Sequence, residues 1–452
     1  MTPRYQTNPT RPAGRSVSRR GFLGLAGGGL LAGAAAAGGF GAVDRLLAVS
    51  AGQDADYRPA AAAVDTGLIL VTIQLEGGLD FLDTVIPLND PAYGQLRRSS
   101  GVDLGSAIPI DRDFAFHPSL PYLAERWGGG ELAIVHGVGY PDSSLSHFVD
   151  TAIWERGTED QAEATGWIGR SLDAYAGEDA DPLLGISIGT LTPAMYGPDW
   201  NPVSLSEEGQ LPWTGSFIEE NPDLVRAYAR LAAAPSMPNG DLADRVRAGQ
   251  TLVREVADTI GGATDLEALG RTFELLEEGE AEADAVDDEA SNAGAGVLAH
   301  RLGVVADLIA GGLPTRAYHV AHGGDFDTHG EQAYSLPGLL RSLDEGLRAF
   351  DQRLGPLRSR VVVATWTEFG RRPDWNGSGT DHGTAGTQFV LGPRVAGGHH
   401  GDPVSLTRFD FDDNFFVTGD YRRYLAGLAQ GVLGVDGTRI LGPGVTPMGV
   451  IV

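Results

Sequence analysis

The 452-residue chain contains no cysteine, which excludes disulfide bonds and a lipidated cysteine as means of stabilising or anchoring it. Basic residues are scarce, because 33 Lys and Arg stand against 60 Asp and Glu for a formal net charge of −27. A surface of that sign repels nucleic acid and anionic membranes, so we expect no nucleic-acid partner. An anionic substrate is not excluded, since a bound metal cation reverses the field inside a single cleft.

Internal repeats are also absent, and 42% hydrophobic residues together with 65 glycines indicate a globular chain rich in loops. Paired arginines at 18–23 (SRRGFL) precede an uncharged Gly/Ala-rich run at 24–43, which is typical of a twin-arginine export signal. We therefore expect the Tat translocase to export the folded chain to the periplasm, the cell envelope or the medium. A membrane anchor is the alternative, because about 20 residues suffice to span a bilayer.

Two features favour a removable signal over an anchor. The many glycines and alanines make the run only weakly hydrophobic, and residues 49–51 (VSA) offer a small-residue cleavage site. We expect residues 1–51 to be removed, so that the mature form does not span the membrane. Residues 52–66, which are small and polar, predict a flexible leader before the folded domain.

Apolar, β-branched runs of strand length alternate with helical patterns along the rest of the chain. The predicted strands are 68–75, 132–138, 317–321 and 360–365. The predicted helices are 118–127, 297–309 and 336–354. This alternation predicts an α/β fold over residues 67–452, with a doubly wound, mostly parallel sheet covered on both faces. Residues 217–296 break the rhythm and predict a helical insertion with an acidic loop at 277–284.

Acidic, hydroxyl and imidazole side chains follow each of the four predicted strands. In an open α/β sheet ligands bind outside the carboxyl ends of the strands, so we expect these segments to meet in one site. Carboxylate oxygen and imidazole nitrogen together suit divalent ions such as zinc or manganese. The segments are 76–80, 139–148, 322–329 and 367–383.

Several of these residues have both a chemical and a structural interpretation. Ser146, at the start of a predicted helix, can be a nucleophile or a helix cap. Arg371 can hold a tetrahedral anion through two hydrogen bonds. His329 and His382 can be metal ligands or hydrogen-bonded structural residues, and Glu368 can be a ligand or pair with a neighbouring arginine, Arg371 or Arg372. His117 and His136 are expected to be structural, and 397–402 (GGHHGD) predicts a turn between two strands.

A set of motifs in a fixed order resembles the DUF1501 family of exported bacterial proteins, which often carry twin-arginine signals and have no settled activity. The resemblance extends from about Leu68 to the C-terminus. The motifs are 77–80 (GGLD) with 84–87 (TVIP), 146–148 (SHF), 326–329 (FDTH) with Gln332, 368–371 (EFGR), 379–383 (GTDHG) and 419–422 (GDYR).

DUF1501 proteins look like a branch of the alkaline phosphatase and sulfatase superfamily. That resemblance implies a fold of this type with divalent metal ions, which could be Zn, Mn, Ca or Mg. In this chain Asp327 and His329 are closer together than the usual superfamily pair, and Glu368-Phe369 stands where many members have Asp-His. The metal ligands implied are Asp80 (or Glu76), Asp327, His329, Glu368, Asp381 and His382, and the candidate catalytic residues are Ser146, its neighbour His147, and Arg371.

The leading hypothesis is an exported, metal-dependent hydrolase of phosphate or sulfate esters with Ser146 as the nucleophile and Arg371 holding the anion. The alternative is a catalytically inactive scaffold that serves as an extracytoplasmic binding or assembly protein, for a surface polysaccharide or a cosecreted partner. A metal-bound hydrolase that uses water in place of the serine is a third possibility.

Overall fold

The computed structural model describes residues 64–97, 102–177, 181–198, 202–207, 259 and 295–452. All of the described elements belong to one compact unit, residues 53–221 and 253–452. A second unit, residues 1–52 and 222–252, lies outside the described residues. The predicted export signal and nearly all of the predicted helical insertion, including its acidic loop, lie outside them too.

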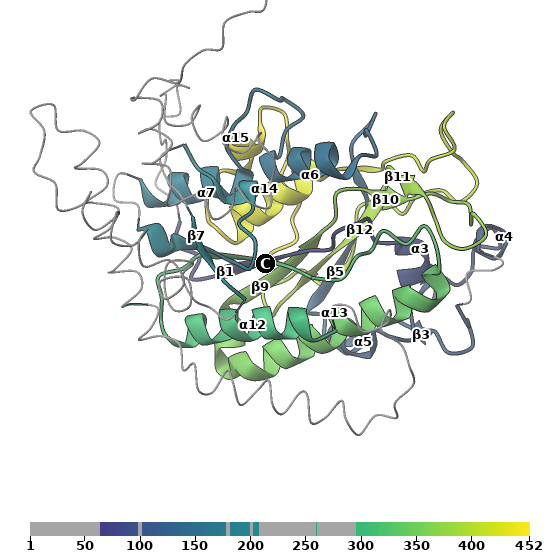
Figure 1. The fold of residues 1–452 in the computed structure, drawn as a ribbon, viewed down its shortest axis with the longest axis horizontal. Coiled ribbons are helices and arrows are strands. Elements are labelled where there is room, and N and C mark those ends of the chain that lie inside the picture. The colour runs from purple at the N-terminus through teal and green to yellow at the C-terminus, as the bar shows by residue number, and fades with distance from the viewer. Residues whose placement is uncertain (1–63, 98–101, 178–180, 199–201, 208–258, 260–294) are drawn as a thin grey trace, which may run out of the picture. The chain divides into compact units, whose positions relative to one another are not determined.

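A mixed sheet of nine strands forms the centre of this unit (Figure 1). The strand order is β13-β5-β12-β9-β1-β8-β6-β7, with β14 paired to β5 as well. Neighbouring strands run parallel except β12, which is antiparallel to both β5 and β9. The strands are β1 (Ile69–Gln74), β5 (Leu132–Gly139), β6 (Gly185–Ile188), β7 (Val203–Leu205), β8 (Ala317–Ala321), β9 (Val361–Trp366), β12 (Gly386–Leu391), β13 (Gly398–His400) and β14 (Gly419–Asp420).

Both faces of the sheet are buried beneath helices, because side chains of each central strand alternate between two apolar cores. In β1, Val71 and Ile73 pack into one core and Leu70 into the other. The first core is covered by α5 (Pro121–Gly128), α12 (Ala295–Ala310) and α13 (Gln332–Leu354) (Figure 1). The second is covered by α6 (His147–Arg156), α7 (Trp167–Ala176), α14 (Tyr421–Gly431) and α15 (Gly437–Leu441).

Smaller elements complete the fold. Strands β2 (Val85–Pro87), β4 (Phe114–Phe116) and β3 (Ile108–Pro109) form a three-stranded sheet, and β10 (Gly370–Arg371) pairs with β11 (His382–Gly383). The short helices are α3 (Phe81–Thr84) and α4 (Tyr93–Leu96), with 3-10 turns at Pro182–Leu184, Pro193–Met195 and Gly355–Arg360. Among the described residues, no helix has the length and apolar character needed to cross a membrane.

The α/β class, the mostly parallel sheet, and all four predicted strands and three predicted helices are confirmed, with ends shifted by a few residues. One local prediction is wrong. Residues 398–400 form strand β13, which pairs in parallel with β5 at the edge of the sheet, where a turn was expected. Three residues of alternating exposure are too few to distinguish a short edge strand from a turn by pattern alone.

Candidate metal centre

The loops that follow β1, β8 and β9 begin at the same level of the sheet. Gln74 at the end of β1 pairs with Ala321 of β8 on one side and Trp366 of β9 on the other. Because the three strands are parallel, their following loops leave from one edge and lie together. The start of α6, which follows β5, and strand β11 bring further polar side chains to the same place.

Gly77 allows two of these loops to pack closely. Its φ is +104°, and a Cβ at this position would lie 2.2 Å from the backbone nitrogen of Asp327. Its own N–H donates to Oε1 of Glu368 at 2.9 Å. Only glycine tolerates both the positive φ and this approach, so the residue joins the loops after β1, β8 and β9.

Three side chains, His147, Asp327 and His382, could hold a metal ion together. Each offers one ligand atom, and these atoms all lie within 4.8 Å of one another. His382 Nε2 is 2.8 Å from Asp327 Oδ1, and His147 Nε2 is 3.4 Å from Asp327 Oδ2. We call these three residues the metal cluster.

The hydrogen bonds on the far side of each imidazole determine which ring nitrogen faces Asp327. His147 Nδ1 lies 2.8 Å from Glu368 Oε1, and His382 Nδ1 lies 2.8 Å from the carbonyl oxygen of Leu145. Both oxygens act as acceptors, so Nδ1 of each ring donates its proton to them, and Nε2 is the atom that each ring would offer to an ion beside Asp327. Metal-binding histidines in proteins are oriented in this way, by a carboxylate or carbonyl at the other nitrogen.

His329 adds a third imidazole beside the metal cluster. Its Nε2 lies 2.8 Å from His382 Nε2 and 3.1 Å from Asp327 Oδ1. Its Nδ1 lies 2.8 Å from Asp381 Oδ1 and can donate its proton there, so Nε2 faces the metal cluster. Imidazole nitrogen and carboxylate oxygen atoms at such short range share a proton or could share a metal cation.

The charges within the metal cluster depend on these hydrogen bonds. Partial burial favours the protonated form of Asp327, but hydrogen bonds from His382 and Arg371 outweigh it, and the pKa of its carboxyl lies below the usual value. The hydrogen bond to Glu368 raises the pKa of His147. Asp327 is therefore ionised at neutral pH, as a ligand must be.

Glu368 and Asp381, both predicted as metal ligands, contact histidines instead. Glu368 is 2% exposed, and its Oε1 binds both the N–H of Gly77 and Nδ1 of His147. Asp381 Oδ1 binds Nδ1 of His329. In this structure the two carboxylates orient imidazole rings toward Asp327.

Asp80 is likewise held away from the metal cluster. Its carboxylate is buried and lies 3.1 Å from Nη2 of Arg97 through both oxygens. It also accepts hydrogen bonds from Gln332 at 2.8 Å and Thr380 at 3.1 Å, and it caps helix α3. With its oxygens fully used, Asp80 acts in this structure as a buried anchor for the loop after β1.

Arg371 is fully buried, and its donors are directed to protein oxygens. Those acceptors are the carbonyl oxygens of Gly77, Gly78 (2.8 Å), Phe326 (2.8 Å) and Thr380 (2.7 Å), and Asp327 Oδ1 (2.7 Å). The guanidinium therefore binds three loop segments, 77–78, 326–327 and 380, and orients Asp327, which differs from the predicted contact with an anion. This difference follows from burial, which sequence spacing does not reveal.

The next residue, Arg372, is the arginine that sequence reasoning missed as a candidate. It is half-buried, and the one hydrogen bond of its side chain to described residues joins Nε to the carbonyl oxygen of His382 at 3.2 Å. Successive residues of an extended segment point to opposite sides. That alternation was the available signal, since it implies that only one of two adjacent arginines can be internal.

Ser146 occupies the N-cap position of α6, with φ −104° and ψ 121°, as the expectation of a helix start requires. Its side chain makes no capping hydrogen bond. The hydroxyl is partly buried and stands next in sequence to His147 of the metal cluster. In this structure the capping interpretation of Ser146 is not realised.

The buried pair Asp80 and Asp83 gives a testable dependence of stability on pH. Burial and the nearby charge of Asp80 raise the pKa of Asp83 to about 7, while Arg97 Nε lies 3.5 Å from its carboxylate. A folded-state pKa above the unfolded one means that this group stabilises the fold at low pH, and that this contribution is lost as the pH rises toward 7.

We expect Asp83→Asn to remove that dependence, since asparagine cannot ionise. Thermal unfolding between about pH 5 and pH 8 should show the wild type losing stability relative to the variant as the pH rises. Asp412→Asn, at an exposed site, is the control. If the stability of wild type and of Asp83→Asn changed with pH in the same way, the raised pKa assigned to Asp83 would be contradicted.

Comparison with known proteins gives a family but no activity. A family model described as "Protein of unknown function (DUF1501)" matches residues 134–412, a stretch that includes the whole metal cluster. No match is found among curated proteins. Among solved structures, one described as "Crystal structure of Ps i-CgsB" covers 78% of this chain and 75% of that chain, with 8% sequence identity and a TM-score of 0.28. A similarity this low carries no argument about fold or function.

Proposed function

Because the chain belongs to the DUF1501 family, whose description assigns no activity, we propose its function from the site itself: a metal-dependent hydrolase of phosphate or sulfate esters. The observation that carries this proposal is the convergence of imidazole Nε2 atoms on the ionised carboxylate of Asp327. We also propose, from the twin-arginine pattern, that the chain folds and takes up metal before export by the Tat translocase.

His147, Asp327 and His382 would hold the ion, with His329 beside them. A donor set dominated by imidazole nitrogen favours zinc or manganese over calcium or magnesium, which prefer oxygen. Such an ion, when bound, supplies Lewis-acid chemistry that lowers the pKa of an attached oxygen and stabilises a leaving oxygen.

In this proposal the Ser146 hydroxyl is the nucleophile. It attacks phosphorus or sulfur and the alcohol leaves, after which water cleaves the serine ester and releases the inorganic anion. The position of Ser146 supports the role, because its Oγ does no capping and the first N–H groups of α6 carry the positive end of the helix dipole. Arg372, with both Nη atoms unengaged by described residues, replaces Arg371 as the group that holds the anion.

The test combines turnover with metal analysis. Purified protein is assayed on aryl phosphates and aryl sulfates, and its metal content is measured in parallel. We expect Ser146→Ala to lower turnover by at least about a thousandfold while the metal content stays unchanged. Ser405→Ala, at an exposed site, should behave as wild type. Full activity in Ser146→Ala would replace the serine mechanism by attack of water.

One observation favours the alternative function, a binding or assembly scaffold without turnover. Arg371, the residue expected to hold the anion, is fully enclosed by protein oxygens. A wild-type protein that binds metal but is inert toward every ester, or that binds no metal, would support the scaffold and reject the hydrolase.

A further inference from the structure

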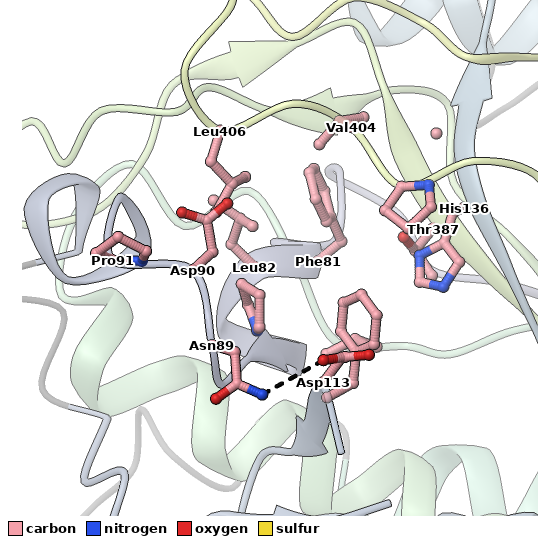
Figure 2. A pocket seen from close by; sticks show the side chains of 15 residues that line it. Phe81, Leu82, Asn89, Asp90, Pro91, Asp113, His136, Thr387, Val404 and Leu406 are labelled. Atoms are coloured by element: carbon pink, nitrogen blue, oxygen red, sulfur yellow. Dashed lines mark hydrogen bonds between the residues drawn. The ribbon is translucent and has the colours of Figure 1, made fainter. Parts of the chain in front are cut away.

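A pocket of about 470 Å³ lies among residues that the metal cluster does not use (Figure 2). It is lined by residues from α3, from β2 and residues 89–91 after it, from β4 and the loop before it, from β5, from β12, and by Pro403, Val404 and Leu406. Its volume falls within the range of small-molecule sites in proteins. The lining combines apolar walls with a few polar groups, which is the usual composition of such sites.

The walls are aromatic and aliphatic. Phe81 and Leu82 come from α3, Phe114 from β4, and Val404 and Leu406 from the segment beyond β13. Figure 2 shows Phe81, Leu82, Val404 and Leu406 around the hollow, with the carboxylates of Asp90 and Asp113 among them. An organic ligand with an apolar body therefore suits this space better than a bare ion.

The charged side chains of the lining are all acidic. Asp90 and Asp113 line the pocket, and none of the lining residues is a lysine or an arginine. Asp113 accepts a hydrogen bond from Asn89 at 3.3 Å (Figure 2) and forms an exposed ion pair with Arg112, which is weak in water. Asp90 has no ion pair within the described part of the chain. The lining therefore attracts cations and repels anions.

A buried hydroxyl without a hydrogen-bond partner lies opposite a β-bulge. Between Gly386, opposite Val138, and Gln388, opposite Val135, β12 has one residue, Thr387, and β5 has two, His136 and Gly137, so the extra residue of the bulge lies on β5. Thr387 lines the pocket, is 1% exposed, and its Oγ1 has no hydrogen-bond partner. Bulges redirect side chains near functional sites, and a buried hydroxyl without a partner is costly unless a ligand or water completes it.

His136 adds a second neutral acceptor. Asp111 Oδ2 lies 2.7 Å from His399 Nε2, and His399 Nδ1 lies 2.7 Å from His136 Nε2. The carboxylate accepts, so the protons lie on His399 Nε2 and His136 Nε2, and Nδ1 of His136 is left as a lone pair. Burial, with the neighbouring His399, lowers the pKa of His136 to about 3, so the ring stays uncharged at neutral pH.

We propose that this pocket binds a small organic cation, an ammonium group carried on an apolar body. Asp90 and Asp113 attract its charge, Thr387 Oγ1 and His136 Nδ1 accept its N–H groups, and the ring faces of Phe81 and Phe114 stabilise a cation further. The same charge excludes the anionic esters proposed for the metal cluster, so the two sites take different ligands.

The test uses three ligands of nearly equal shape and different charge, measured by calorimetry on the full chain. They are 2-phenylethylamine, 2-phenylethanol and phenylacetate, with glucose as a neutral polyhydroxyl compound. We expect the amine to bind, the alcohol to bind about tenfold more weakly, and phenylacetate and glucose not to bind. Added salt should weaken binding of the amine and leave binding of the alcohol unchanged.

Variants locate the site. Asp90→Asn and Asp113→Asn should each lower the affinity for the amine by about three- to tenfold and leave the affinity for the alcohol unchanged. Thr387→Val should lower both affinities, and Asp412→Asn, at an exposed site, should change neither affinity. The proposal is overturned if the amine does not bind, or if glucose alone binds. It is also overturned if amine and alcohol bind equally tightly, or if both aspartate variants keep the wild-type affinity for the amine. His382→Ala should keep amine binding, so failure of the proposed hydrolase is distinguishable from failure here.

Discussion

Replacing His382 by alanine is expected to abolish tight metal binding. The substitution removes the Nε2 atom that lies 2.8 Å from Asp327 Oδ1 and 2.8 Å from His329 Nε2, between the two other candidate ligands. Loss of a group that merely orients a ligand typically costs about 10- to 100-fold in metal affinity, and loss of the ligand itself should exceed that. Calorimetric titration with zinc or manganese measures the change.

A matched control is His400→Ala, because Nε2 of His400 bonds the carbonyl oxygen of Ala396 and takes no part in the metal cluster. That variant should bind metal as the wild type does. Acid should weaken wild-type binding, since Glu368 raises the pKa of His147 and a protonated imidazole cannot ligate. Unchanged affinity in His382→Ala would mean that any metal binds elsewhere.

Replacing Arg371 by methionine is expected to lower the free energy of unfolding by about 3–5 kcal/mol, the range found when one partner of a buried ion pair is removed. The variant would leave several carbonyl oxygens and one oxygen of Asp327 without their buried donor. Arg371→Lys should restore little of this lost stability, because a single ammonium cannot reach the several acceptors that bind the planar guanidinium. Urea denaturation measures both.

Exposed Arg394→Met provides the control and should stay within about 0.5 kcal/mol of the wild type. Comparison of Arg371→Met with Arg394→Met also separates two roles for Arg371. If Arg371 served only to hold an anion, Arg371→Met would unfold like the wild type and lose only turnover. A structural link between loops instead predicts that stability and metal affinity fall together, because Asp327 loses the hydrogen bond that orients it.

The strand and helix pattern was predictable because it rests on local periodicity. The run at 68–75 is apolar and β-branched throughout, and a strand buried on both faces requires this. The antiparallel placement of β12 was not predictable, since its apolar pattern suits either direction and only its partners β5 and β9 decide it.

The location of the site was predictable from the sequence, but the contacts of its side chains were less so. The rule that ligands bind at the carboxyl ends of strands indicated the right loops, and His147, Asp327 and His382 were all among the candidates. Spacing could not tell that Glu368 contacts the far nitrogen of His147, or that Arg97, from a different segment, neutralises Asp80.

By itself, the sequence determined the acidic character of the chain, the strand and helix pattern, and which loops carry carboxylates and imidazoles. These properties depend on composition and on neighbours a few residues apart. The tertiary structure alone decided that Arg371 is buried and Arg372 half-buried, which ring nitrogen of His382 faces Asp327, and that Thr387 lines a pocket. Burial and hydrogen-bond partners come from segments hundreds of residues apart, so only the packed fold fixes the chemistry of each side chain.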